Sequence, residues 1–169
     1  MSIATAVPVV LSVIALVFSI YVFIDSHKRD RRDTFIKIHE LLISTDIQRG
    51  RYLLFEKVTD VESVKRLPDD EYRDISQAIA VYNLLGVYLK NGYVTERDVV
   101  EVWGRAIYRA WITAQPFLAW REHNQGYKAW PYFELLAKRV QEALTRNGSL
   151  PAYVMRRRSV GDADQEVDD

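Results

Sequence analysis

The first 24 residues of the chain carry no charged side chain, whereas the remainder holds all 23 basic and 23 acidic residues. Residues 3–24 form an unbroken run of apolar and weakly polar residues, and a helix of that length measures about 33 Å. The hydrocarbon core of a bilayer is about 30 Å thick. A cleaved signal peptide would start with basic residues and end at small ones, which this run does not do. We therefore predict that residues 1–25 form one transmembrane anchor, inserted in lipid through residues 3–24.

Basic residues follow the uncharged run. Lys28, Arg29, Arg31 and Arg32 lie in the juxtamembrane segment 26–33. Because Lys and Arg are retained on the cytoplasmic side of a membrane, they predict a single-pass protein of the cell (inner) membrane with its N-terminus outside. Two roles are open for these four residues, since they can set the topology alone or also contact anionic lipid headgroups.

Residues 34–148 show apolar side chains at spacings of three and four, which is typical of amphipathic helices. We predict an all-α protein in which a cytoplasmic bundle of about five or six helices follows the anchor. The anchor is expected to continue into the first of them, because no Gly or Pro lies between residues 24 and 44. The charged segment 149–169 is predicted to be disordered.

Several residues predict where the helices begin and end. Ser44 opens a polar break with N-cap chemistry, and the central helix 72–90 should stop at the Asn91-Gly92 pair. Thr95 begins a sequence like a capping box, and Pro116 should kink or break the helix that follows it. Pro131 suits the first turn of a last helix over residues 130–146.

The composition excludes several classes of function. The zero net charge argues against nucleic-acid binding, and a chain without cysteine has no disulfide, thiolate metal site or Cys nucleophile. No metal-binding histidine spacing, Gly-rich phosphate loop or nucleophile elbow occurs. We predict that the protein is not an enzyme and holds neither a cofactor nor a metal.

Some polar residues lie within otherwise apolar helices. A ligand-binding interpretation brings five of them together in a polar pocket for an anion, and these are Arg49, Tyr52, Glu56, Asn83 and Arg121. In the alternative interpretation, Asn83 and one or two arginines make buried hydrogen bonds that fix the helix packing.

Tryptophans are concentrated in the last third of the chain. Trp111, Trp120 and Trp130 suit a protein-binding surface, because aromatic residues dominate interface hot spots. The same residues at helical spacing also suit a plain hydrophobic core.

The soluble part resembles a bacterial family of unknown function, whose members are small helical proteins that often have one N-terminal membrane span. The resemblance covers roughly residues 33–145. It rests on Arg49-Gly50-Arg51, the Asn83 helix that closes at Asn91-Gly92, Tyr93-Val94-Thr95, the Trp111 helix, Arg121-Glu122 and the closing helix 132–139. It implies a helical architecture and no activity.

Three functions follow from these observations. The first is a non-catalytic, membrane-anchored module that binds or regulates a protein partner, or self-associates. The second is a small-ligand sensor or enzyme that uses the Arg/Tyr/Asn pocket. The third is an accessory subunit of a membrane complex, for which Ala15 and Ser19 provide the small-xxx-small spacing of associating helices.

Overall fold

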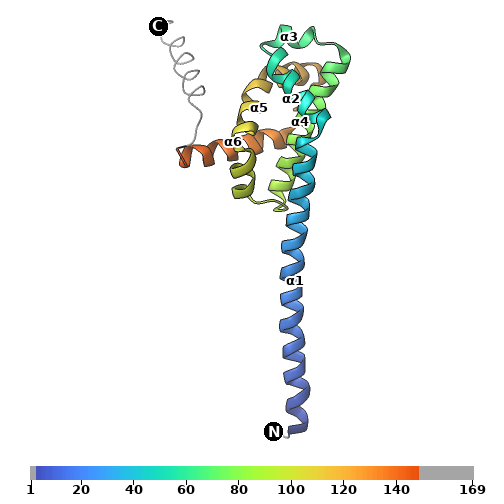
Figure 1. The fold of residues 1–169 in the computed structure, drawn as a ribbon, viewed down its shortest axis with the longest axis vertical. Helices are drawn as coiled ribbons and strands as arrows, with labels where there is room; N and C mark the ends of the chain where they lie inside the picture. The colour runs from blue at the N-terminus through green and yellow to red at the C-terminus, as the bar shows by residue number, and fades with distance from the viewer. Residues whose placement is uncertain (1–2, 149–169) are drawn as a thin grey trace.

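The computed structural model describes residues 3–148, apart from the side chains of residues 3–13, 17 and 23–30. Over this range the chain forms six helices and no strand, which confirms the all-α prediction. The helices are α1 Ile3–Ile43, α2 Thr45–Lys57, α3 Val61–Lys65, α4 Asp69–Lys90, α5 Glu96–Gln125 and α6 Pro131–Arg146 (Figure 1). The tail predicted at 149–169 lies outside the described residues.

Helix α1 runs unbroken from Ile3 to Ile43, so the uncharged run does continue into the first helix of the bundle. Its N-terminal half projects from the other helices as a stalk, while Ile38 and Leu42 near its end are buried (Figure 1). Ser44 takes the N-cap position of α2 but makes no cap bond there. Its hydroxyl instead donates to the carbonyl oxygen of Leu41 at 2.7 Å, so it completes α1.

The predicted membrane span has only part of its side chains among those described. Within the described part of the chain, no helix combines the length and the apolar character that crossing a bilayer requires. Of residues 3–24, the described side chains are those of 14–16 and 18–22, and all of them are exposed. The remaining side chains of the run lie outside the described residues, and the anchor stays a prediction.

Helix α4 is the centre of the bundle, because it packs against both α2 and α6, and α6 in turn packs against α5. Its apolar residues fill the core, as expected of the central helix. The buried residues of α4 are Ile75, Ala78, Ile79, Val81, Tyr82, Leu85, Gly86 and Leu89. The helix ends at Asn91, and Gly92 follows in the left-handed conformation with φ +73°, as the Asn-Gly pair predicted.

Two glycines set how closely the helices approach α4. A Cβ atom at Gly50 of α2 would lie 2.2 Å from the carbonyl oxygen of Asp74 in α4. A Cβ atom at Gly86 of α4 would lie 2.1 Å from the carbonyl oxygen of Tyr132 in α6. Both neighbours are backbone atoms, which cannot rotate away as a side chain can. Both crossings therefore require glycine.

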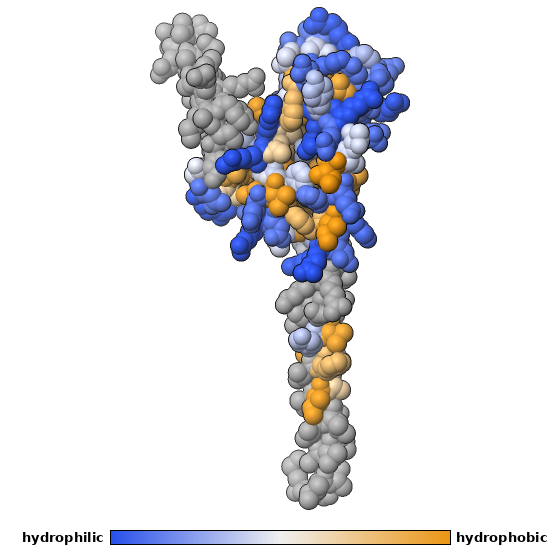
Figure 2. Space-filling view, viewed as in Figure 1, coloured by the Kyte–Doolittle hydropathy of each residue, from blue (hydrophilic) through white to orange (hydrophobic). Residues whose placement is uncertain are grey.

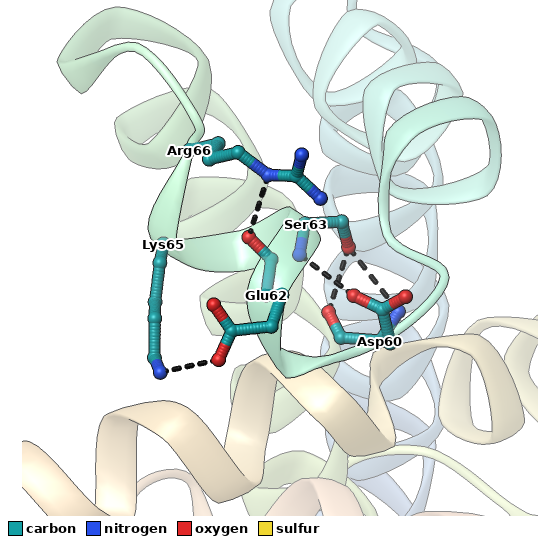
Figure 3. Close-up of polar contacts among 5 residues, drawn as sticks. All are labelled: Asp60, Glu62, Ser63, Lys65 and Arg66. Atoms are coloured by element: carbon teal, nitrogen blue, oxygen red, sulfur yellow. Dashed lines mark hydrogen bonds and ion pairs between the residues drawn. The ribbon is translucent and has the colours of Figure 1, made fainter.

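The connection between α2 and α4 holds a short helix, α3, that is closed at its start by a capping box (Figure 3). The Ser63 amide donates to Asp60 Oδ1 at 2.7 Å, and the Asp60 amide donates to Ser63 Oγ at 3.2 Å. The first of these bonds lowers the pKa of the exposed Asp60 carboxyl. Each of these bonds gives a partner to an amide that has none within so short a helix. The capping box therefore stabilises the five-residue helix α3.

The predicted break at Pro116 is wrong, because α5 continues through Pro116 to Gln125. Phe117 and Leu118 directly after the proline are buried, so core packing holds this segment in register. The Gln115 side chain donates to the carbonyl oxygen of Trp111 at 3.0 Å, next to the point where proline removes a helical hydrogen bond. The helix ends at Gly126, which has φ +70°.

The Gly86→Ala variant tests the close approach of α4 and α6. Its Cβ atom would overlap a backbone carbonyl, so we expect a loss of about 1–3 kcal/mol in the free energy of unfolding. Thermal unfolding of the full chain in detergent measures it, with each kcal/mol lowering Tm by roughly 4 °C.

Gly104→Ala in α5 is the matched control. The new Cβ would meet only ordinary van der Waals contacts of 3.5–3.7 Å, so the gain in helix propensity should leave Tm unchanged or higher. Equal losses in both variants would contradict the assigned packing.

Candidate functional site

Three of the predicted pocket residues lie on the outer side of α2. The Arg49 guanidinium pairs with two carboxylates of α4, at 3.1 Å from Asp74 and 3.8 Å from Asp70. Tyr52 is 63 % exposed and Glu56 is also exposed. None of the three points into an enclosed space, and the Arg49 pair links α2 to α4.

Asn83 acts as the cap of another helix. Its side-chain oxygen accepts hydrogen bonds from the amides of Tyr132 at 3.0 Å and Phe133 at 3.2 Å, at the start of α6. The first amides of a helix have no partner within the helix, so Asn83 satisfies two of them from α4. Gly86 lies about one turn further along α4, and its missing side chain allows the start of α6 to come close enough to Asn83 for these hydrogen bonds.

The Arg121 side chain contacts α4, α5 and the α5–α6 connection. One of its terminal nitrogens donates to Ser76 Oγ at 3.2 Å, and its Nε donates to Gln125 Oε1 at 3.1 Å. The guanidinium lies over the Trp130 ring, 4.2 Å from the centroid. Trp130 itself has φ +54°, a costly conformation for a bulky residue, at the N-cap of α6. The arginine thus supports the strained turn that presents α6 to Asn83.

The five residues of the polar pocket predicted from the sequence make separate contacts. The α2 residues face outward, Asn83 caps α6, and Arg121 stacks on Trp130, so the five side chains do not converge. The alternative interpretation, in which Asn83 and the arginines fix the helix packing, agrees with their contacts.

The three tryptophans of the predicted interface are partly buried and pack against the core. Trp111 meets Phe133 edge-on at a centroid distance of 5.2 Å, and Trp130 stacks on Phe117 at 6.3 Å. Trp120 carries the Lys65 ammonium over its ring at 5.2 Å. These contacts favour the core interpretation over a partner-binding surface.

Sequence reasoning missed three buried side-chain polar atoms without a hydrogen bond, which are Glu71 Oε2, the Tyr82 hydroxyl and Trp103 Nε1. The Tyr82 hydroxyl has no hydrogen bond of normal geometry, and burial raises its pKa, although the nearby Arg51 charge opposes the rise. Trp103 Nε1 is likewise buried without a partner, and the His39 ring of α1 lies 5.1 Å from the Trp103 ring. Tyr82 stacks on Phe133, and its helical spacing with Ile75, Ile79 and Leu89 is the signal that places it on the buried face of α4.

A groove lies where α1 leaves the bundle, and we call it the α1–α5 groove. Its volume is about 490 Å³. It is lined by Arg31, Arg32 and Phe35 of α1, Tyr93, Val94 and Thr95 of the α4–α5 turn, and Asp98, Glu101 and Val102 of α5. Two basic residues from α1 therefore share one groove with two acidic residues from α5.

The charges of the α1–α5 groove are largely available to a ligand. Among the described residues, no ion pair involves Arg31, Arg32 or Asp98, and Glu101 has only the exposed Arg97 at 4.0 Å. One Arg31 terminal nitrogen lies 4.0 Å from where a Gly92 Cβ atom would be, so its guanidinium is at the α4–α5 turn. Tyr93 and Val102 are about half exposed.

A larger groove of about 950 Å³ lies between α5 and α6. Here Glu96 already pairs with Arg146 at 3.1 Å and with Arg139 at 4.0 Å. These internal pairs leave fewer charges for a ligand than in the α1–α5 groove. Among the side chains described, no cluster of three or more metal-ligating residues occurs.

The fold and its contacts define a small all-α domain built on a long N-terminal helix. The chain belongs to the family described as Domain of unknown function (DUF4760), whose model matches residues 6–140. This agrees with the predicted membership of a family of unknown function. No curated protein and no solved structure matches the chain.

The Asn83→Ala variant tests the cap on α6. Loss of the acceptor leaves the Tyr132 amide without its partner and the Phe133 amide with only the Trp130 carbonyl oxygen at 3.1 Å, which should lower the free energy of unfolding by about 1–2 kcal/mol. Hydrogen exchange should accelerate at these two amides more than in α2.

Asn83→Asp is the matched control, because the carboxylate keeps the acceptor and a negative charge is favoured at a helix N-terminus. Its stability should stay close to that of the parent chain. An equal loss in both variants would show that the oxygen acceptor is not the reason for Asn83.

Proposed function

We propose that the protein is a membrane-anchored helical module that works by binding another protein, without catalysis. The observation that carries this proposal is the continuity of α1. One helix includes the uncharged residues 3–24 and also places Ile38 and Leu42 in the bundle core. A partner-binding domain on such a helix is held at a defined height and angle over the bilayer.

Two further observations support the anchor. The family match begins at residue 6, so the apolar run and the helical domain belong to one matched unit. The described part of the stalk is apolar and exposed, whereas hydrophilic residues cover most of the visible bundle surface (Figure 2). Exposing these apolar side chains to water is unfavourable, whereas the hydrocarbon core of a bilayer accommodates them. The basic residues Lys28, Arg29, Arg31 and Arg32 support an orientation with the N-terminus outside and the bundle in the cytoplasm.

The partner surface that we propose is formed by α1 and α2, in place of the predicted tryptophans. Ile36, Leu41, Ile43 and Tyr52 are large apolar residues that stay between 37 % and 63 % exposed. Tyrosine at the centre of a protein contact contributes strongly to affinity.

A second candidate is assembly within a membrane complex through α1 itself. Ala15 and Ser19 are both exposed and lie four residues apart, which permits close approach of a second helix.

Charges introduced into the uncharged run test the anchor. An arginine at a span centre costs about 2.5–3.5 kcal/mol, so a chain with both Ile14→Arg and Phe18→Arg should leave the membrane fraction. Alkaline extraction followed by flotation measures this, and the parent chain should resist extraction.

Ile36→Arg with Ile43→Arg is the matched control. It places the same two charges on exposed positions of the same helix, beyond the uncharged run, and should remain in the membrane. A parent chain that is released by alkaline extraction would overturn the anchor.

Site-specific photocrosslinking tests the partner surface. A photoreactive residue at Tyr52 should give one discrete crosslinked product in cells. The control is Tyr127 of the α5–α6 connection, which is equally exposed at 63 %. Products of the same size and yield from both positions would show that α2 has no preferred partner.

A further inference from the structure

The α4–α5 turn is the part of the bundle that lies beside the stalk of α1 (Figure 1). Tyr93 in this turn is 52 % exposed, and the Arg31 guanidinium of α1 lies against Gly92 of the same turn. The α1–α5 groove is therefore at the end of the bundle from which the uncharged run departs.

The depth of this groove follows from helix geometry. Arg31 is seven residues beyond Ile24, the last residue of the uncharged run, which is about 10 Å along a helix. The headgroup layer adds roughly 5–8 Å outside the hydrocarbon core. Arginine side chains reach further by extending toward the membrane interface. With residues 3–24 in the bilayer, lipid headgroups lie next to the groove.

The two walls of the groove carry opposite charges. Arg31 and Arg32 of α1 provide guanidinium groups, which bind phosphate oxygens through charge-assisted hydrogen bonds. Asp98 and Glu101 of α5 provide carboxylates, which accept hydrogen bonds from an ammonium group. A ligand that fits both walls carries a phosphate and a protonated amine a few bonds apart. Phe35 and Val102 add apolar surface beside them.

We propose that the α1–α5 groove binds the zwitterionic headgroup of a phospholipid that bears a primary amine, namely phosphoethanolamine. This rests on the proposed membrane anchor. A phosphocholine headgroup carries no N–H to donate to the carboxylates, and a phosphoglycerol headgroup carries no cation at all. The groove thereby distinguishes phosphoethanolamine from both, and a bound lipid joins α1 to α5 at the membrane surface.

Native mass spectrometry of the full chain tests this site. The chain is released from micelles that contain phosphatidylethanolamine, phosphatidylcholine and phosphatidylglycerol at equal mole fraction. The chain should retain phosphatidylethanolamine about tenfold over the other two, the effect of one charge-assisted hydrogen bond. Equal retention of all three lipids by a chain that still resists alkaline extraction would overturn the headgroup site and leave the anchor intact.

Two double variants separate the walls of the groove. Asp98→Asn with Glu101→Gln should abolish the preference over phosphatidylcholine while phosphate binding persists. Arg31→Gln with Arg32→Gln should reduce retention of every phospholipid. The matched controls are Glu56→Gln with Glu142→Gln, and Arg105→Gln with Arg139→Gln, which neutralise exposed residues outside the groove. Unchanged selectivity in the acidic double variant would overturn the proposal.

Soluble glycerophosphoethanolamine distinguishes the source of the headgroup. With a lipid ligand, millimolar amounts of the soluble compound should leave retained phosphatidylethanolamine unchanged, because it lacks the membrane attachment. Retention of the soluble compound in place of the lipid would overturn the assignment to a membrane lipid.

Discussion

The crossing of α6 over α4 is the contact on which the rest of the bundle depends. Gly86 allows the Tyr132 carbonyl to approach α4 more closely than any side chain would permit. Asn83, one turn earlier, then accepts the first two amides of α6. A close approach and a directed pair of hydrogen bonds together define where α6 begins. Because α5 packs on α6, its position follows from the same crossing.

The long α1 helix links this packing to the proposed function. Among the residues whose side chains are described, α1 contributes Ile38 and Leu42 near its end to the bundle core, and the proposed anchor uses the earlier residues 3–24. A continuous helix transmits orientation as well as position, which a flexible linker does not. The α1–α5 groove forms where the stalk leaves the bundle, so any ligand bound there is in a position to influence both.

Helix ends were predicted correctly where one residue type determines the local backbone conformation. The Asn91-Gly92 stop and Pro131 in the first turn of α6 both depend on local chemistry, and both were correct. The predicted break at Pro116 was wrong, because the buried Phe117 and neighbouring core residues outweigh one missing hydrogen bond. Ser44 was placed correctly, but its hydroxyl serves the preceding helix. In both cases tertiary packing or a competing partner decided the outcome.

The sequence by itself determined the all-α class, the continuity of α1 and an uncharged run of bilayer length, because periodicity, charge and Gly or Pro positions are local properties. Only the tertiary structure decided which polar residues meet. Arg49 and Arg121 were candidates for one pocket, yet one pairs across α2 and α4 while the other stacks on Trp130. The groove that unites Arg31 with Asp98 joins segments more than sixty residues apart. Helical periodicity assigns residues to faces of a helix, but the crossing geometry determines which faces come together.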